Sequence, residues 1–115
     1  MVNDQWEEKL ARYDQLIQKQ SNFERLGKTM PYTSANGHMF SQLNKKGELG
    51  IRLSKEQRQQ FLKDHNTTLF MAYDTVMQEY VLIPEILFDD MDLLFSYLKD
   101  GYEYVKSLKP KTSKN

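Results

Sequence analysis

The chain has 115 residues with 16 basic and 16 acidic side chains, so its formal net charge is zero. This length predicts one domain, and the absence of cysteine excludes disulfide scaffolds, thiol catalysis and cysteine-ligated metal centres. The polar N-terminus does not resemble a signal peptide, and no apolar run approaches the about 20 residues that span a bilayer, so we expect a cytoplasmic protein.

Helical spacing of apolar side chains predicts a first helix within residues 4–26. Its stripe has spacings of four, three and four residues: Trp6, Leu10, Tyr13 and Ile17. Asp4, with Glu7 three residues later, is typical of a helix N-cap. Gly27 favours termination, and the sequence leaves open whether the helix continues through 20–26.

A three-stranded antiparallel meander is expected over residues 28–53. The first strand, over 29–33, contains Pro31 and is therefore restricted to an edge. Asn36-Gly37 is typical of a two-residue hairpin turn, which needs positive φ at both positions. We expect the strand over 38–44 to place Met39, Ser41 and Leu43 on one face. A turn follows at 45–47. We expect the next strand, over 48–53, to place Leu49, Ile51 and Leu53 on one face.

The second half predicts a short helix, two strands and a long helix. Ser54 and Gln57 form a capping box for a helix to about residue 64, and strands follow over 69–73 and 77–83. Pro84 opens a helical turn over 85–88. We expect Asp89 to cap the last helix, which contains Gly101 where a close approach to the sheet would explain a missing side chain.

The predicted element order is α-β(3)-α-β(2)-α. It indicates an α+β fold of two layers, with a mostly antiparallel five-stranded sheet and the helices packed on one face. Residues 1–109 are expected to form the single domain, and 110–115 a flexible basic tail.

Several segments together resemble the TfoX N-terminal-domain family. These are the hairpin over 30–40, the strand over 47–54 and the segment Met77-Gln-Glu-Tyr-Val-Leu-Ile-Pro84. The last segment fits a family pattern of Met-x-Glu-Tyr-Val-x, then an apolar residue and proline. The resemblance covers about residues 5–108. The family often has Met-Phe-Gly at the first hairpin, where this chain has Met30-Pro31-Tyr32, so no site is transferred to that hairpin.

The resemblance implies the same two-layer fold and a small bacterial module that acts by binding. TfoX itself is associated with the regulation of competence, and its relatives include single domains without an assigned activity. We therefore expect a non-enzymatic regulatory or protein-interaction module, with no cofactor and no second regulator domain. Fold resemblance alone does not determine function.

Candidate catalytic residues are sparse. His38 and His65 lack the context of a nucleophile triad, and no glycine-rich phosphate loop occurs. The acidic run at 89–92 is explained by helix capping and lacks the spacing of a calcium loop, so we expect no metal site. A small-ligand binder or minor enzyme that uses Glu79 or His38 beside a pocket remains an alternative.

Charge is distributed unevenly along the chain. Residues 1–73 have eleven basic and eight acidic side chains, a net charge of +3. Residues 74–103 have one basic and eight acidic side chains, a net charge of −7, and residues 104–115 have four lysines, a net charge of +4. The zero total therefore does not exclude a basic face. A second alternative is a nucleic-acid-binding domain that uses five residues: Lys45, Lys46, Arg52, Lys55 and Arg58.

Aromatic residues occur on more than one side of the last helix. They exceed the single stripe that one core face requires, and they form a candidate interaction surface for a protein partner or homodimer: Phe95, Tyr97, Tyr102 and Tyr104. The alternative is that they pack beneath a long loop of the same chain.

Overall fold

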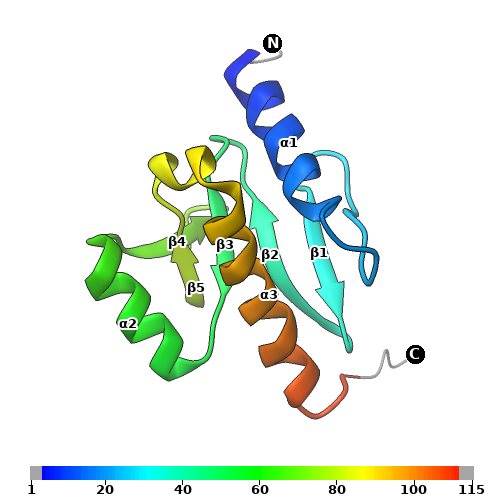
Figure 1. The fold of residues 1–115 in the computed structure, drawn as a ribbon, viewed down its shortest axis with the longest axis vertical. Coiled ribbons are helices and arrows are strands. Elements are labelled where there is room, and N and C mark those ends of the chain that lie inside the picture. The colour runs from blue at the N-terminus through cyan, green and yellow to red at the C-terminus, as the bar shows by residue number, and fades with distance from the viewer. Residues whose placement is uncertain (1–3, 112–115) are drawn as a thin grey trace.

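Within residues 4–111, which the computed structural model describes, five strands form one antiparallel sheet in the order β1-β2-β3-β5-β4 (Figure 1). The strands are β1 (Tyr32–Ala35), β2 (His38–Leu43), β3 (Leu49–Arg52), β4 (Leu69–Ala72) and β5 (Thr75–Leu82). The helical segments are α1 (Asp4–Ile17), α2 (Lys55–His65), the 3-10 turn η1 (Glu85–Asp89) and α3 (Met91–Ser107). The predicted α+β class and element order are confirmed.

The main core lies between the helices and one face of the sheet. Buried residues of α1, α2, η1 and α3 form a single cluster with the strands. Leu49, Ile51 and Leu53 are at most 1% exposed and belong to this cluster, so the predicted alternation of this strand is confirmed. A β-carbon at Gly101 would lie 2.7 Å from the carbonyl oxygen of Arg52, which confirms that α3 approaches the sheet closely there.

The alternation predicted for β2 is interrupted by a bulge. Its pairing with β1 shifts register between Thr33 and Ser34, which adds one residue to β2. Leu43 therefore packs in the main core, whereas Met39 packs against a second cluster on the opposite face. The prediction that Met39, Ser41 and Leu43 share one face was wrong.

The first helix ends at Ile17 and does not continue through 20–26. The side chain of Gln20 closes this end, because its amide nitrogen donates to the carbonyl oxygen of Ile17 at 2.7 Å and its amide oxygen accepts from the backbone N–H of Phe23 at 3.0 Å. The ring of Phe23 then packs edge-on against Phe40, with 4.9 Å between ring centroids. The loop from α1 to β1 is therefore attached to the core.

Two further boundaries differ from the sequence predictions. The first strand begins at Tyr32 rather than in the segment before Pro31. Asp90, and not Asp89, caps α3, because its carboxylate accepts a hydrogen bond from the N–H of Leu93 at 3.2 Å.

The other face of the sheet is partly covered by the β4–β5 hairpin. Tyr73 and Asp74 have φ values of +55° and +60°, so they form a tight left-handed turn. Phe70 of β4 is fully buried and lies over Gly50 of β3, where a β-carbon would be 2.3 Å from the ring. Phe70 belongs to the second buried cluster with Ala72 and Tyr80. β4 therefore curls back across the sheet and forms one wall of a cavity.

The segment after α3 returns to the β1–β2 turn. The backbone N–H of Lys111 donates to the carbonyl oxygen of Asn36 at 3.2 Å. Of the tail predicted at 110–115, residues 112–115 lie outside the described residues. Within residues 4–111, no helix has the length and apolar character needed to cross a membrane.

Candidate binding cavity

A cavity of about 600 Å³ opens between β4, the turn after it and the β2–β3 turn. This volume is within the usual range of small-molecule sites. Its apolar lining comes from Met30, Leu69, Met71, Ala72 and Leu82. Its polar lining comes from Asn44, Lys45, Lys46, Glu48, Thr68, Tyr73 and Asp74. The cavity thus combines an apolar surface with charged groups carried by two turns.

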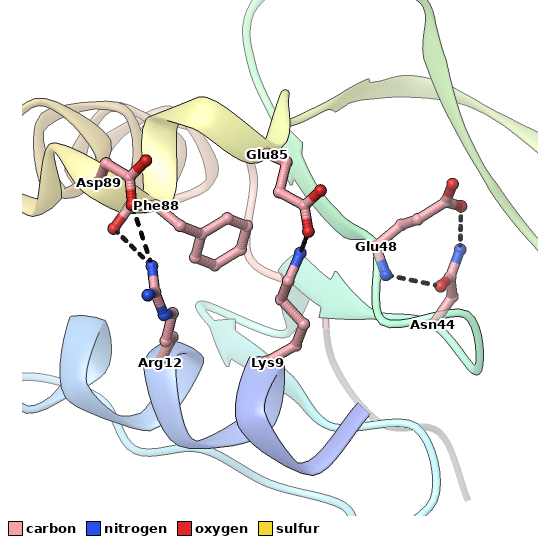
Figure 2. Close-up of polar contacts among 7 residues, drawn as sticks. All are labelled: Lys9, Arg12, Asn44, Glu48, Glu85, Phe88 and Asp89. Atoms are coloured by element: carbon pink, nitrogen blue, oxygen red, sulfur yellow. Dashed lines mark hydrogen bonds and ion pairs between the residues drawn. The ribbon is translucent and has the colours of Figure 1, made fainter. Parts of the chain in front are cut away.

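Asn44 fixes the position of the turn that carries the two lysines. Its side-chain amide nitrogen donates to a carboxylate oxygen of Glu48 and to the carbonyl oxygen of Met71, each at 2.9 Å. Its amide oxygen accepts from the backbone N–H groups of Lys46 and Glu48, each at 3.0 Å. Figure 2 shows the two bonds between Asn44 and Glu48. Because Asn44 is only 6% exposed and uses both ends of its amide, the turn is held rigidly against β4.

The helical layer supports the same turn. The indole nitrogen of Trp6 in α1 donates to the carbonyl oxygen of Asn44 at 2.9 Å. The N–H of Gly47 donates to that same oxygen at 3.0 Å. Asn44 therefore connects α1, the β2–β3 turn and β4, and the cavity wall is organised before anything binds.

The β4–β5 hairpin exposes large apolar side chains beside the cavity. Met71 is 46% exposed and Tyr73 is 71% exposed, and both line the cavity, while Val76 on the next strand is 42% exposed. Exposed apolar side chains that gather beside a concave site are typical of binding surfaces.

The charged residues that line the cavity lie on two different turns. Lys45 and Lys46 are both exposed on the β2–β3 turn. Glu48 is partly buried and its carboxylate is held by Asn44, and Asp74 lies on the separate β4–β5 turn. The β2–β3 side therefore presents two exposed ammonium groups and one partly buried carboxylate to a ligand.

No protein-family model, curated protein or solved structure matches this chain. The site is therefore assigned from the geometry of its own residues.

The five residues proposed from the sequence for nucleic-acid binding do not lie together. Lys45 and Lys46 precede β3, whereas Arg52 ends it, and the four residues of this strand alone span about 10–13 Å. Lys55 and Arg58 follow on α2, beyond that far end. The cavity brings together only the first two of the five.

Both arginines of that set have partners within the chain. Arg52 forms an ion pair with Glu79 at 2.6 Å and lies over the ring of Tyr104, 5.6 Å from its centroid. Arg58 donates to the carbonyl oxygen of Leu53 at 3.0 Å. These contacts position the two guanidinium groups against the fold.

The aromatic residues of α3 pack largely against their own chain. Tyr102 stacks near Phe23 of the loop before β1, with 5.1 Å between ring centroids, and Tyr97 packs edge-on against Phe61 of α2 at 4.7 Å. Phe95 and Tyr104 are also partly buried and contact the main core. The surface predicted for partners thus consists of half-buried rings, and packing beneath the loop accounts for Tyr102.

Neither of the residues considered for catalysis lines the cavity beside β4. The cavity beside β4 and three shallower hollows along α1 are lined by neither Glu79 nor His38. His38 interacts with the carbonyl oxygen of Lys109 at 2.9 Å, and His65 with the hydroxyl of Tyr97 at 2.8 Å. Both histidines therefore have contacts within the fold.

The acidic residues near η1 pair with α1. Lys9 forms an ion pair with Glu85, and Arg12 with Asp89 at 3.4 Å (Figure 2). The hydrogen bond from Lys9 holds the pKa of Glu85 below its usual range. Among the described residues, no group of three or more histidine or carboxylate side chains could hold a metal ion. These carboxylates attach η1 to α1.

Sequence reasoning missed Asn44, Met71 and Tyr73 as site residues. Met71 lies in β4 and Tyr73 in the turn after it, and in the sequence both resemble ordinary strand and turn residues. Their exposure depends on how the β4–β5 hairpin curls over the sheet. An asparagine before a Lys-Lys-Gly turn was the available signal for Asn44, since asparagine side chains often bond the backbone two residues on.

Proposed function

We propose that this chain is a non-enzymatic regulatory module, similar to TfoX N-terminal domains, that holds a segment of a protein partner in the cavity beside β4. The observation that carries the proposal is the rigid cavity with Met71 and Tyr73 exposed on one side and Lys45 and Lys46 on the other. Apolar contact supplies binding energy, and the lysines supply orientation.

Site-specific photocrosslinking in the cells that make the protein tests this function. A benzophenone amino acid replaces Tyr73, which is aromatic and 71% exposed, so the substitution is mild. The matched control places the same group at Gln59, an exposed position on α2. We expect a discrete protein adduct from position 73, and none from position 59.

A charge reversal shows whether an adduct reports the cavity. Combining the crosslinker at position 73 with Lys45→Glu and Lys46→Glu is expected to reduce the adduct at least fivefold. Equal adducts from positions 73 and 59, or an adduct that is unchanged by the charge reversal, would contradict the proposed function.

A further inference from the structure

β4 is an edge strand of the described sheet, with β5 as its only strand neighbour. In its two-residue hairpin, Ala72 and Thr75 form the hydrogen-bonded pair next to the turn, so Met71 and Val76 form a non-hydrogen-bonded pair. The N–H and C=O of Met71 therefore point away from β5. The carbonyl confirms this direction, because it accepts from Asn44.

The opposite edge of the sheet is covered at the start of β1. Leu26 and Tyr32 exchange two backbone hydrogen bonds, of 2.8 and 2.9 Å, beside β1. Pro31, which has no N–H, precedes this strand. β4 is the edge that directs a backbone donor outward next to the cavity.

We propose that the partner contributes an extended segment that adds to β4 as a sixth strand, with an acidic side chain toward Lys45 and Lys46. The proposal rests on the function proposed above and specifies its binding mode. The outward N–H of Met71 supplies a main-chain hydrogen bond, and its carbonyl oxygen retains a lone pair beyond the one that Asn44 uses.

The side chains of such a segment would alternate between the cavity and the solvent. Those on the cavity side meet the apolar surface of Met71 and Leu82. The segment passes the β2–β3 turn, where the two exposed ammonium groups lie and the carboxylate of Glu48 is already bonded to Asn44. This arrangement favours an acidic side chain over a basic one at that place.

Capped pentapeptides provide the probes. The parent peptide has the sequence threonine, valine, glutamate, valine, threonine, and a second peptide has lysine in place of glutamate. The full-length chain is labelled with ¹⁵N, and the shift of the Met71 amide signal is followed during titration. We expect the glutamate peptide to bind at least tenfold more tightly than the lysine peptide, and Lys45→Glu with Lys46→Glu to reverse this order.

Backbone methylation distinguishes strand addition from binding by side chains alone. One version of the glutamate peptide is N-methylated at both valines and the other at the glutamate. Since the N–H groups of alternate residues face the same edge, strand addition predicts that one version loses binding at least tenfold while the other retains it. Equal affinities for the two versions, whether both strong or both weak, would overturn the proposal.

The crosslinking experiment and the peptide titration distinguish failure of the binding mode from failure of the proposed function. A Lys45- and Lys46-dependent crosslink at position 73, together with equal binding of both methylated peptides, would overturn strand addition and leave the interaction function standing. Loss of the crosslink would overturn the function itself, and with it the binding mode.

Discussion

The side-chain amide of Asn44 donates a hydrogen bond of 2.9 Å to the carbonyl oxygen of Met71, 27 positions later in the chain. This bond joins the β2–β3 turn to an edge strand that is not its neighbour in the sheet. It closes one side of the candidate cavity and sets how far β4 curls over the sheet. Asn44 is thus the residue on which the shape of the cavity depends most directly.

Replacement of Asn44 by alanine removes four hydrogen bonds made by its side chain. Backbone groups of a partly buried turn lose their partners, so we expect the free energy of unfolding to fall by about 2–4 kcal/mol. Urea denaturation measures this change. Asn22→Ala, at an exposed loop position, is the control and should change stability by less than about 0.5 kcal/mol. Equal effects of the two substitutions would contradict the role of Asn44.

Asn36 provides a second test of a single side chain, at the end of α3. Its amide nitrogen donates to the carbonyl oxygens of Val105 and Leu108, at 2.9 and 2.8 Å, while its backbone has a left-handed φ of +57°. Asn36→Asp preserves the turn preference but places a carboxylate against two carbonyl oxygens. We expect a loss of about 1–3 kcal/mol in thermal or urea unfolding.

Asn66→Asp is the matched control for this substitution. Asn66 also has a left-handed φ, of +50°, but it is exposed at the C-cap of α2. The same change there places an exposed carboxylate at a helix C-terminus, which should cost about 0.3–1 kcal/mol. A loss at position 66 as large as that at position 36 would show that backbone strain, and not the bonds to α3, explains the effect.

Local signals in the sequence predicted the elements well, and the failures occur where distant segments meet. The N-cap at Ser54 and the Asn36-Gly37 turn depend on neighbouring residues, and both form as expected. The bulge in β2 depends on its register with β1, and the curl of β4 depends on Phe70 meeting Gly50 across β5. Neither relationship has a signature in nearby sequence, so the cavity could not be predicted.

The difference between local and long-range relationships also explains why the five basic residues proposed from the sequence do not lie together. Counting charges along the chain grouped Lys46 with Arg52, but a strand runs between them and places them at opposite ends of β3. The order of charges along the chain therefore does not show which basic residues are neighbours in space. In the structure, Lys45 and Lys46 line the same cavity as Met71 and Tyr73.

Gly101→Ala tests the close approach of α3 to the sheet. Alanine favours a helix by about 1 kcal/mol over glycine, but its β-carbon would lie 2.7 Å from the carbonyl oxygen of Arg52 and 3.1 Å from a methyl group of Ile51. Because the first of these atoms belongs to the backbone, we expect steric strain to exceed the helix preference. The net result should be a loss of about 1–3 kcal/mol in urea unfolding.

Ser96→Ala, at an exposed position of the same helix, separates the two contributions. There the helix preference acts with little steric change, so stability should stay the same or rise by a few tenths of a kcal/mol. A stabilising Gly101→Ala would mean that α3 can move away from β3 at little cost, and it would contradict the tight contact.

Tyr80 gives a prediction for alkaline pH. Burial raises its pKa well above the ordinary value near 10, and its hydroxyl donates to the carbonyl oxygen of Met39 at 2.7 Å. A group whose pKa is higher in the folded state contributes full stability below its unfolded pKa and loses it as the pH rises. Stability should therefore fall above about pH 10, where the unfolded chain releases this proton.

Tyr80→Phe should be less stable at pH 7, because it lacks the bond to Met39, but its stability should fall less steeply between pH 10 and 12. Urea unfolding across this range measures both slopes, and equal slopes would show that the Tyr80 phenol does not govern the alkaline loss.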